Sequence, residues 1–370
     1  MRYRDSTSRH EEELRAWAGA LLVEGSAPRQ APVSDYQEIG TFLRHHGLEA
    51  LIFGRMDRTS MPADVAAEWK AGLSRAAALE LARKEEFVSV MRALSPQGQP
   101  SPIVFKGQAL AYSLYPQPWL RPRVDVDLLI EKTRFDTVEK SLVGLGYERF
   151  NAIDGDLILR QAIFQKRSFH TMHAWDVHWA ISNRPALAGA LTYRRLLETA
   201  TPRDVDGVSI LVPDLVDALL IACVHLIGHH SADTRLIWLY DIHLLANALS
   251  EAQCHDFLRA AAAHAEMKSA CRASLELTGL YLPTRRTRDL SRLLGSATGV
   301  RAPAVRSRFM HLLQDARAVR GSDRIAFVRQ HLFPSPAYMT RRYGIKRRWQ
   351  LPFWYVIRIG RALPKLFGRQ

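Results

Sequence analysis

Several features are missing from this sequence, and each absence excludes a class of protein or a kind of site. No stretch of about 18 residues is apolar and free of charge, so we expect no transmembrane helix. Residues 1–5 already carry charged side chains and no apolar signal-peptide core, which predicts a cytoplasmic location. No Walker or dinucleotide-binding glycine loop occurs, which leaves kinases and dehydrogenases without support. The three cysteines lack metal-ligand spacing, are too few for a disulfide framework and are expected to be buried thiols: Cys223, Cys254 and Cys271.

The chain is long, apolar and basic. With 370 residues and 47% hydrophobic content, it can bury a real core divided into two or three structural units. A formal net charge of +14 would attract nucleic acid, nucleotides or an anionic membrane face. A general positive charge without any specific partner explains the same balance equally well.

The pattern of apolar residues changes three times along the chain. Helical spacing dominates residues 10–92, a turn-rich break follows at 95–100, and helical spacing returns over 213–293. Between them, strands are predicted at 103–105, 124–130, 156–166 and 171–182, with helices at 108–115 and 132–145. We therefore expect an α+β protein with a small mixed sheet flanked by helices from both ends. The expected units are an N-terminal helical region (1–94), a core (95–212), a C-terminal helical domain (213–335) and a basic aromatic tail (336–370).

The tail has its own composition. From Pro336 onward it contains nine Lys or Arg residues and no acidic residue, with Tyr, Trp and Phe between them. One interpretation is a solvated helical surface whose aromatic rings pack on the protein itself. The other is a contact with RNA or with an anionic membrane surface, which would make the protein peripheral to the membrane.

Two carboxylates stand at alternate positions in a predicted strand. Strand alternation sends Asp125 and Asp127 to one face, and in the later strand it places Asp176 beside His178. A bare Asp-x-Asp most often lines a solvated edge strand. Here, however, two like charges two residues apart favour a hard divalent cation, Mg²⁺ or Mn²⁺, with Asp176 as the third carboxylate.

Cations surround these carboxylates in the sequence. The predicted strand-to-helix turn at Lys106 and Gly107 offers backbone amides where a phosphate can dock. Arg121 and Arg123 directly precede the acidic pair. A phosphate cradle, counter-charge and metal ligands together are the minimum equipment for displacement at phosphorus.

These residues resemble a known family. The match covers roughly residues 100–340 and rests on Phe105-Lys106-Gly107, Asp125-Val126-Asp127-Leu128-Leu129, Asp176-Val177-His178-Trp179 and Leu332-Phe333-Pro334-Ser335. They are similar to an uncharacterised bacterial nucleotidyltransferase family of the polymerase-β-like superfamily. The sequence departs from the superfamily pattern at Lys106-Gly107-Gln108, which stands where Gly-Ser or Gly-Gly is usual.

The resemblance implies roles for particular residues. Asp125 and Asp127 would be metal ligands, and Asp176 a third ligand or the base toward the acceptor. The residues implied in nucleotide binding are Lys106, Gly107, Gln108, Arg121, Arg123 and His178. His178 could instead orient Asp176 or simply pack. The implied reaction is in-line attack of an acceptor hydroxyl or phosphate on the α-phosphorus of an NTP, with Mg²⁺ and departure of pyrophosphate.

The acceptor stays open at this point. An RNA end, a small molecule or sugar, and a peptide or protein are all compatible with the sequence, because a fold does not fix a substrate. Two rival functions remain: a non-catalytic nucleotide- or RNA-binding protein on the same scaffold, and a toxin-like enzyme that modifies tRNA. Two further signals are interpreted as structural: His225 with His229, four residues apart on a helix, and Asp241, which would cap its helix or pair with Arg235.

Overall fold

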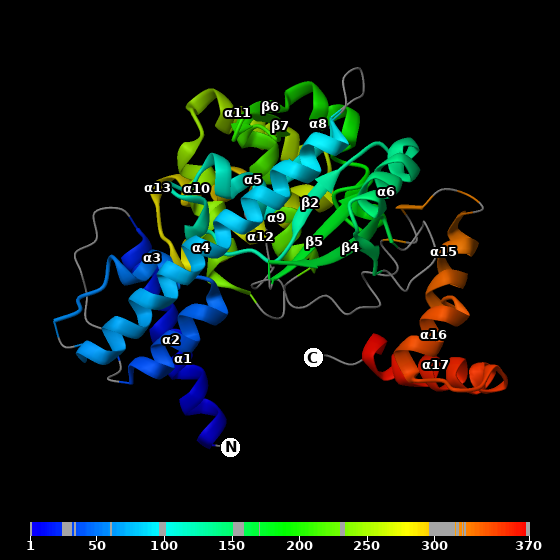
Figure 1. Cartoon of the computed structure of the whole chain (residues 1–370), viewed down its shortest axis with the longest axis horizontal. Helices are drawn as coiled ribbons and strands as arrows, with labels where there is room; N and C mark the ends of the chain where they lie inside the picture. Colours follow the sequence, from blue (N-terminus) through cyan, green and yellow to red (C-terminus); the bar gives the residue numbers. More distant parts are fainter. Residues whose placement is uncertain are drawn as a thin grey trace.

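A seven-stranded mixed sheet forms the centre of the fold (Figure 1). The computed structural model describes residues 2–23, 32, 35–59, 61–95, 101–150, 159–169, 171–229, 234–295, 315, 318–319, 321 and 323–367. Its spatial strand order is β3-β4-β5-β2-β1-β7-β6. The strands are β1 (Ile103–Phe105), β2 (Val126–Leu129), β3 (Glu148–Arg149), β4 (Gln161–Ser168), β5 (Thr171–His178), β6 (Thr201–Val205) and β7 (Val208–Val212).

The central strands pair in both directions. β2 runs parallel to β5, and β1 runs parallel to β7. The other four neighbouring pairs are antiparallel. The expected α+β fold with a mixed sheet and helical flanks is confirmed.

Alternate residues of the central strands enter two different hydrophobic cores. Ile103 and Phe105 pack in one core, whereas Val104 between them packs in the other. Likewise, Leu129 packs in the first core and Leu128 in the second. Because neighbouring side chains of a strand point to opposite faces, the apolar runs of β1 and β2 cover both sides of the sheet.

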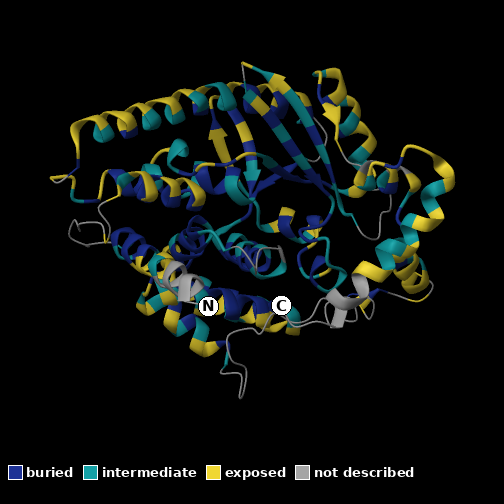
Figure 2. Ribbon diagram, turned by 90° about the horizontal axis from the view of Figure 1, so that it is seen from below, coloured by how far each residue is buried: buried dark blue, intermediate teal, exposed yellow. Residues whose placement is uncertain are grey.

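Helices from both ends of the chain share the larger core. The buried residues of this core include Trp17, Leu43 and Ile52 as well as Leu219, Leu239 and Phe257. The N-terminal helices are α1 (Arg2–Leu22), α2 (Tyr36–His46), α3 (Glu49–Phe53) and α4 (Ala63–Leu94). The C-terminal ones are α9 (Leu215–His229), α10 (Leu236–Ala248), α11 (Glu251–Ala262), α12 (Ala265–Tyr281) and α13 (Arg285–Leu293). Figure 2 shows the buried residues gathered in the strands and on the inner sides of these helices.

The smaller core lies on the opposite face of the sheet. The last turns of α4 supply Phe87 and Leu94 to it, and the sheet supplies Trp175. The rings of Phe87 and Trp175 are stacked, with centroids 5.8 Å apart. The remaining elements of the core region are α5 (Lys106–Ser113), η1 (Pro118–Leu120), η2 (Lys132–Arg134), α6 (Phe135–Gly144), α7 (Pro185–Ala188) and α8 (Tyr193–Thr199).

The β6–β7 hairpin was not identified from the sequence. Its turn is Asp206-Gly207, and both residues have positive φ, 48° and 75°. Asp-Gly is a preferred sequence for a two-residue hairpin turn, so the local signal was present. Part of the expected strand over 156–166 lies outside the described residues, and β4 is seen from Gln161 onward.

The last part of the chain forms a small group of helices, α15 (Asp323–Leu332), α16 (Pro336–Tyr343), η3 (Arg348–Gln350) and α17 (Leu351–Phe367). It stands beside the rest of the protein in both ribbon views (Figures 1 and 2). Across the described residues, no helix combines the length and the apolar character that crossing a membrane requires.

Candidate active site

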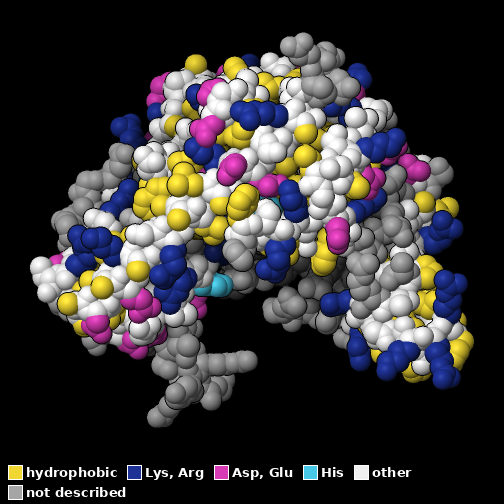
Figure 3. Space-filling model, viewed as in Figure 1, with side chains coloured by type: hydrophobic (Ala, Val, Ile, Leu, Met, Phe, Trp, Pro, Cys, Tyr) yellow, Lys and Arg dark blue, Asp and Glu magenta, His cyan; other side chains and the backbone are white. Residues whose placement is uncertain are grey.

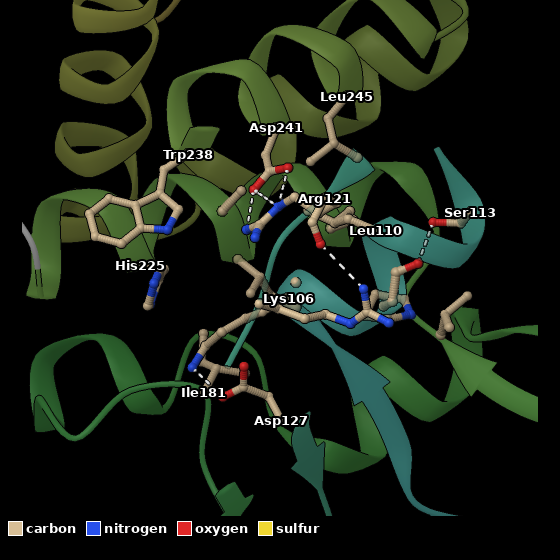
Figure 4. Close-up of a pocket in the computed structure, with 18 of the residues that line it drawn as sticks. Lys106, Leu110, Ser113, Arg121, Asp127, Ile181, His225, Trp238, Asp241 and Leu245 are labelled. Carbon is tan, nitrogen blue, oxygen red and sulfur yellow. Dashed lines mark hydrogen bonds and ion pairs between the residues drawn. The ribbon is translucent and has the colours of Figure 1, made fainter. Parts of the chain in front are cut away.

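A cleft of about 910 Å³ opens between the sheet and the C-terminal helices. One wall comes from β2, β5 and the start of α5, and the other from α9 and α10 (Figure 4). The sheet side carries Lys106 and three carboxylates, whereas the helical side carries the ring of Trp238 together with Arg235 and Asp241. The residues that decide its chemistry are Lys106, Asp125, Asp127, Asp176, His178 and Trp238.

The register of two parallel strands brings the acidic residues together. Asp127 of β2 is paired directly with Asp176 of β5. His178 follows two residues later on the same face of β5. One ligand atom from each of these three residues lies within 4.8 Å of the others. Two carboxylates and an imidazole at this spacing can hold a divalent cation.

Asp125 lies one residue before β2 and lines the same cleft. It is not part of the three-residue cluster. The structure therefore places Asp127, Asp176 and His178 together and leaves Asp125 beside them.

Lys106 and His178 both contact the same oxygen of Asp127. Lys106 Nζ donates to Asp127 Oδ1 over 2.7 Å, and His178 Nε2 lies 2.9 Å from that oxygen. Burial opposes ionisation of Asp127, but the two neighbours outweigh it and hold the pKa of this carboxyl well below its usual range. His178 therefore contacts Asp127, whereas the sequence suggested Asp176 as its partner.

The other two carboxyls behave in the opposite way. Burial and the charge of Asp127 raise the pKa of Asp125 to about 6. Burial, with the charges of Asp127 and Asp125, raises the pKa of Asp176 to about 7. Their mutual repulsion is what a bound divalent cation would remove, and the oxygen-rich donor set suits a hard cation such as Mg²⁺.

Lys106 occupies the turn between β1 and α5. Its φ is 53°, in the left-handed region that non-glycine residues rarely adopt, and α5 begins at this residue. The preceding Phe105 makes no side-chain cap, so the first amides of α5 lack that partner. This is two residues earlier than the predicted helix start, and it keeps the lysine beside Asp127.

Asp176 is held by a polar chain that the sequence did not reveal. Gln161 Nε2 donates to Asp176 Oδ2 over 3.1 Å, and Asn183 Nδ2 donates to Gln161 Oε1 over 3.1 Å. Asn183 in turn accepts from the backbone amide of Arg160. Both amide side chains line the cleft, so Asp176 is fixed from the side opposite Asp127.

Arg121 joins the sheet side of the cleft to α10. Its guanidinium donates to both oxygens of Asp241, with a shortest distance of 2.7 Å, and Tyr115 Oη donates to Asp241 over 2.7 Å. A β-carbon at Gly107 would lie 3.5 Å from Arg121 Nη1, so the guanidinium sits directly beside the start of α5. The expected pairing of Asp241 with Arg235 is wrong, because Arg121 takes its place.

Arg123 is tied to α4 instead. It donates to Glu80 Oε1 over 2.5 Å and also to Gln108, which is itself buried. Tyr112 donates to the same Glu80 oxygen over 2.9 Å. Arg123 and Gln108 thus have protein partners already, and their role toward a nucleotide stays a prediction.

The helical wall carries an aromatic pair. Trp238 of α10 and His225 of α9 meet edge to face, with ring centroids 5.9 Å apart, and both point toward the cleft (Figure 4). The guanidinium of Arg235 lies 5.7 Å from the centre of the indole ring. Leu245 of α10 also lines this wall, and Ile181, just after β5, lines the cleft beside Lys106 and Asp127, so the cleft also suits a flat or apolar group. The side chain of His229 lies outside the described residues.

Residues 32–283 match the sequence model of a family described as an uncharacterised nucleotidyltransferase. The matched segment includes the whole cleft described above and ends before Leu332-Phe333-Pro334-Ser335. No curated protein matches the chain.

The Arg121–Asp241 pair is predicted to be important for stability. Arg121→Ala or Asp241→Ala should each lower the free energy of unfolding by about 3–5 kcal/mol, because each leaves a buried charge without its partner. The double variant Arg121→Met/Asp241→Leu should recover most of this loss. Urea denaturation measures all three. Arg194→Ala, which removes a pair with Glu131 whose arginine side chain is 83% exposed, is the control and should change little.

The acidic cluster predicts a dependence of stability on pH. An acid whose pKa is raised by folding stabilises the folded state at low pH, and this contribution is lost as the pH rises from its unfolded to its folded value. For Asp176 this pH range runs from 3.8 to about 7. The lowered pKa of Asp127 has the opposite effect on stability, and that effect changes only below pH 3.8, its unfolded value. Without divalent cations, the melting temperature should fall between about pH 5 and pH 7 relative to that of Asp176→Asn. Added Mg²⁺ should reverse the trend, because it binds the ionised carboxylates. Parallel pH curves for the two proteins would contradict this assignment.

Proposed function

The chain belongs to the uncharacterised nucleotidyltransferase family, and from that membership and the geometry of the cleft we propose that it transfers a nucleoside monophosphate from an NTP to an acceptor. The observation that carries the proposal is the direct pairing of Asp127 with Asp176, next to His178 and Lys106. It is a largely buried acidic centre in which the ammonium of Lys106 contacts Asp127. Such a centre is suited to displacement at phosphorus, where positioning and neutralisation of charge do most of the work.

The proposed reaction makes one bond and breaks another. An acceptor oxygen attacks the α-phosphorus, the bond from that phosphorus to the bridging oxygen of the β-phosphate breaks, and pyrophosphate leaves. Asp127 and Asp176, with Asp125 beside them, would hold Mg²⁺ or Mn²⁺, which supplies neutralisation of the phosphate charge. When the acceptor is a hydroxyl, Asp176 would receive its proton, and Gln161, which donates to this carboxylate, would keep it oriented.

The triphosphate is assigned to the start of α5. Lys106 offers its ammonium, and the amides of the first turn of α5 add the positive end of a helix. In this arrangement Lys106 exchanges Asp127 for the phosphates when the nucleotide arrives. Arg121 lies beside Gly107 and fixes this turn against α10.

The acceptor is proposed to be a small molecule or sugar. The reacting groups lie inside a cleft of about 910 Å³, which is in the size range of small-molecule sites. RNA ends and peptides remain the competing acceptors. If the acceptor is an RNA end, a toxin-like enzyme that modifies tRNA is one form this activity could take. A cytoplasmic location also stays a proposal.

The transfer itself is tested with α-labelled NTPs. The wild-type protein, Mg²⁺ and each NTP are incubated with separate RNA, protein and metabolite fractions from the source cell. We expect label in the metabolite fraction and a loss of roughly 100-fold or more in Asp127→Asn and in Asp176→Asn. Asp136→Asn, an exposed carboxylate of α6, is the matched control and should retain activity.

Each outcome has a distinct meaning. Label in RNA or protein would change the proposed acceptor class but would still support nucleotidyl transfer. Equal labelling by wild type and both site variants, after thermal unfolding has shown that the variants fold, would contradict the proposed centre. Metal-independent NTP or RNA binding without any transfer would support the non-catalytic alternative.

Trp238 is predicted to contact the base of the NTP. Stacking of a base on an aromatic ring contributes enough that Trp238→Ala should weaken NTP binding by roughly tenfold or more. Binding of inorganic triphosphate, which has no base, should be unchanged. Calorimetric titration of both ligands makes the comparison, with Trp349→Ala, an indole that is 72% exposed on the C-terminal helices, as control. An equal loss for both ligands would place the effect on the phosphates or on folding instead.

A further inference from the structure

The C-terminal unit, defined here as residues 323–367, is held together by some of its aromatic rings. Tyr343 stacks on Trp354 with centroids 5.1 Å apart, and Tyr355 Oη donates to the carbonyl of Pro334 over 2.6 Å. The guanidinium of Arg358 lies 5.7 Å from the centre of the Tyr338 ring. These contacts join α17 to α16 and to Pro334, which lies between α15 and α16, and they involve about half of the aromatic residues in this part of the chain.

Other apolar residues of the unit face away from it. Trp349, Phe353 and Val356 are 72%, 64% and 70% exposed. Their spacing of four and three residues places them on one side of η3 and α17. A stripe of this kind is costly to leave in water, and it runs along an otherwise ordinary amphipathic helix.

Positive charge surrounds this stripe. Residues 336–370 contain nine Lys or Arg residues and no Asp or Glu. Those with exposed side chains in the described part are Arg342, Lys346, Arg347, Arg348 and Arg361. Figure 3 shows Lys and Arg side chains with apolar ones between them over α16 and α17, at the lower right.

We propose that the stripe of Trp349, Phe353 and Val356 inserts into the headgroup region of an anionic lipid surface, with the neighbouring cations on the lipid phosphates. A helix that is basic on one side and aromatic on the other binds such a surface by combining apolar burial with charge attraction. An RNA backbone would bind the cations, but RNA binding does not explain the exposed Val356, because this side chain has no ring on which a base could stack. The unit lies on the membrane and does not cross it.

The test is co-sedimentation of the full-length protein with vesicles of phosphatidylcholine alone or mixed with phosphatidylglycerol. Binding is expected only to the anionic vesicles and should weaken as salt is added. Trp349→Ser/Phe353→Ser/Val356→Ser should lower the vesicle affinity roughly tenfold or more, because it removes the inserted surface. Arg347→Gln/Arg348→Gln/Arg361→Gln should lower it by a similar factor.

The matched control is Leu81→Ser/Leu280→Ser/Leu293→Ser. These leucines are 64%, 67% and 68% exposed on α4, α12 and α13, so the same chemical change is made at the same exposure elsewhere. It should leave vesicle binding unchanged. All variants change surface residues, and equal melting temperatures establish that they fold.

Three results would overturn the proposal. One is the absence of binding to anionic vesicles. Another is an equal loss in the leucine control, which would indicate non-specific adhesion. The last is salt-sensitive binding to single-stranded RNA that survives the Trp349/Phe353/Val356 change, together with no vesicle binding, which would assign the basic surface to nucleic acid.

Discussion

Parallel pairing of β2 with β5 puts the carboxylate of Asp127 beside that of Asp176 in a place largely shielded from water, where two negative charges repel strongly. Neighbouring side chains partly compensate this repulsion. Lys106 reaches Asp127 from the turn after β1, and His178 reaches it from β5, so the order β5-β2-β1 is needed for the centre to exist at all. A slip of β5 by one residue would turn Asp176 into the smaller core and bring Trp175 or Val177 to the cleft.

The second wall of the cleft depends on a different long-range contact. Arg121, just before the acidic strand, pairs with Asp241 in the middle of α10, and both are buried. The helices behind α10 share their core with the N-terminal helices, so the ends of the chain together support the side of the cleft that faces the metal ligands. Movement of α10 would therefore change the distance between Trp238 and the acidic centre, which is the distance between the proposed base and phosphate sites.

The sequence predicted the parts of this site that depend on local pattern. Alternation in 124–130 and 171–182 correctly indicated the strands and the side on which Asp127, Asp176 and His178 lie, because the direction of a side chain in a strand follows from its position alone. The partners of charged groups were harder to predict. Asp241 is 120 residues from Arg121, and Glu80 is 43 from Arg123, and no local rule links such positions. The support of Asp176 by Gln161 and Asn183 was also missed, because Gln161 is paired in the β4–β5 register with His178 and not with Asp176, and Asn183 lies beyond the end of β5.

The most direct measurement is the anomalous scattering of Mn²⁺ in crystals grown with a non-hydrolysable NTP analogue. We expect a Mn²⁺ peak within coordination distance of the carboxylates of both Asp127 and Asp176 and of the nucleotide phosphates, with Lys106 moved from Asp127 to the phosphates. A nucleotide bound elsewhere in the protein, or Mn²⁺ bound away from the β2–β5 pair while the cleft holds the nucleotide, would contradict it.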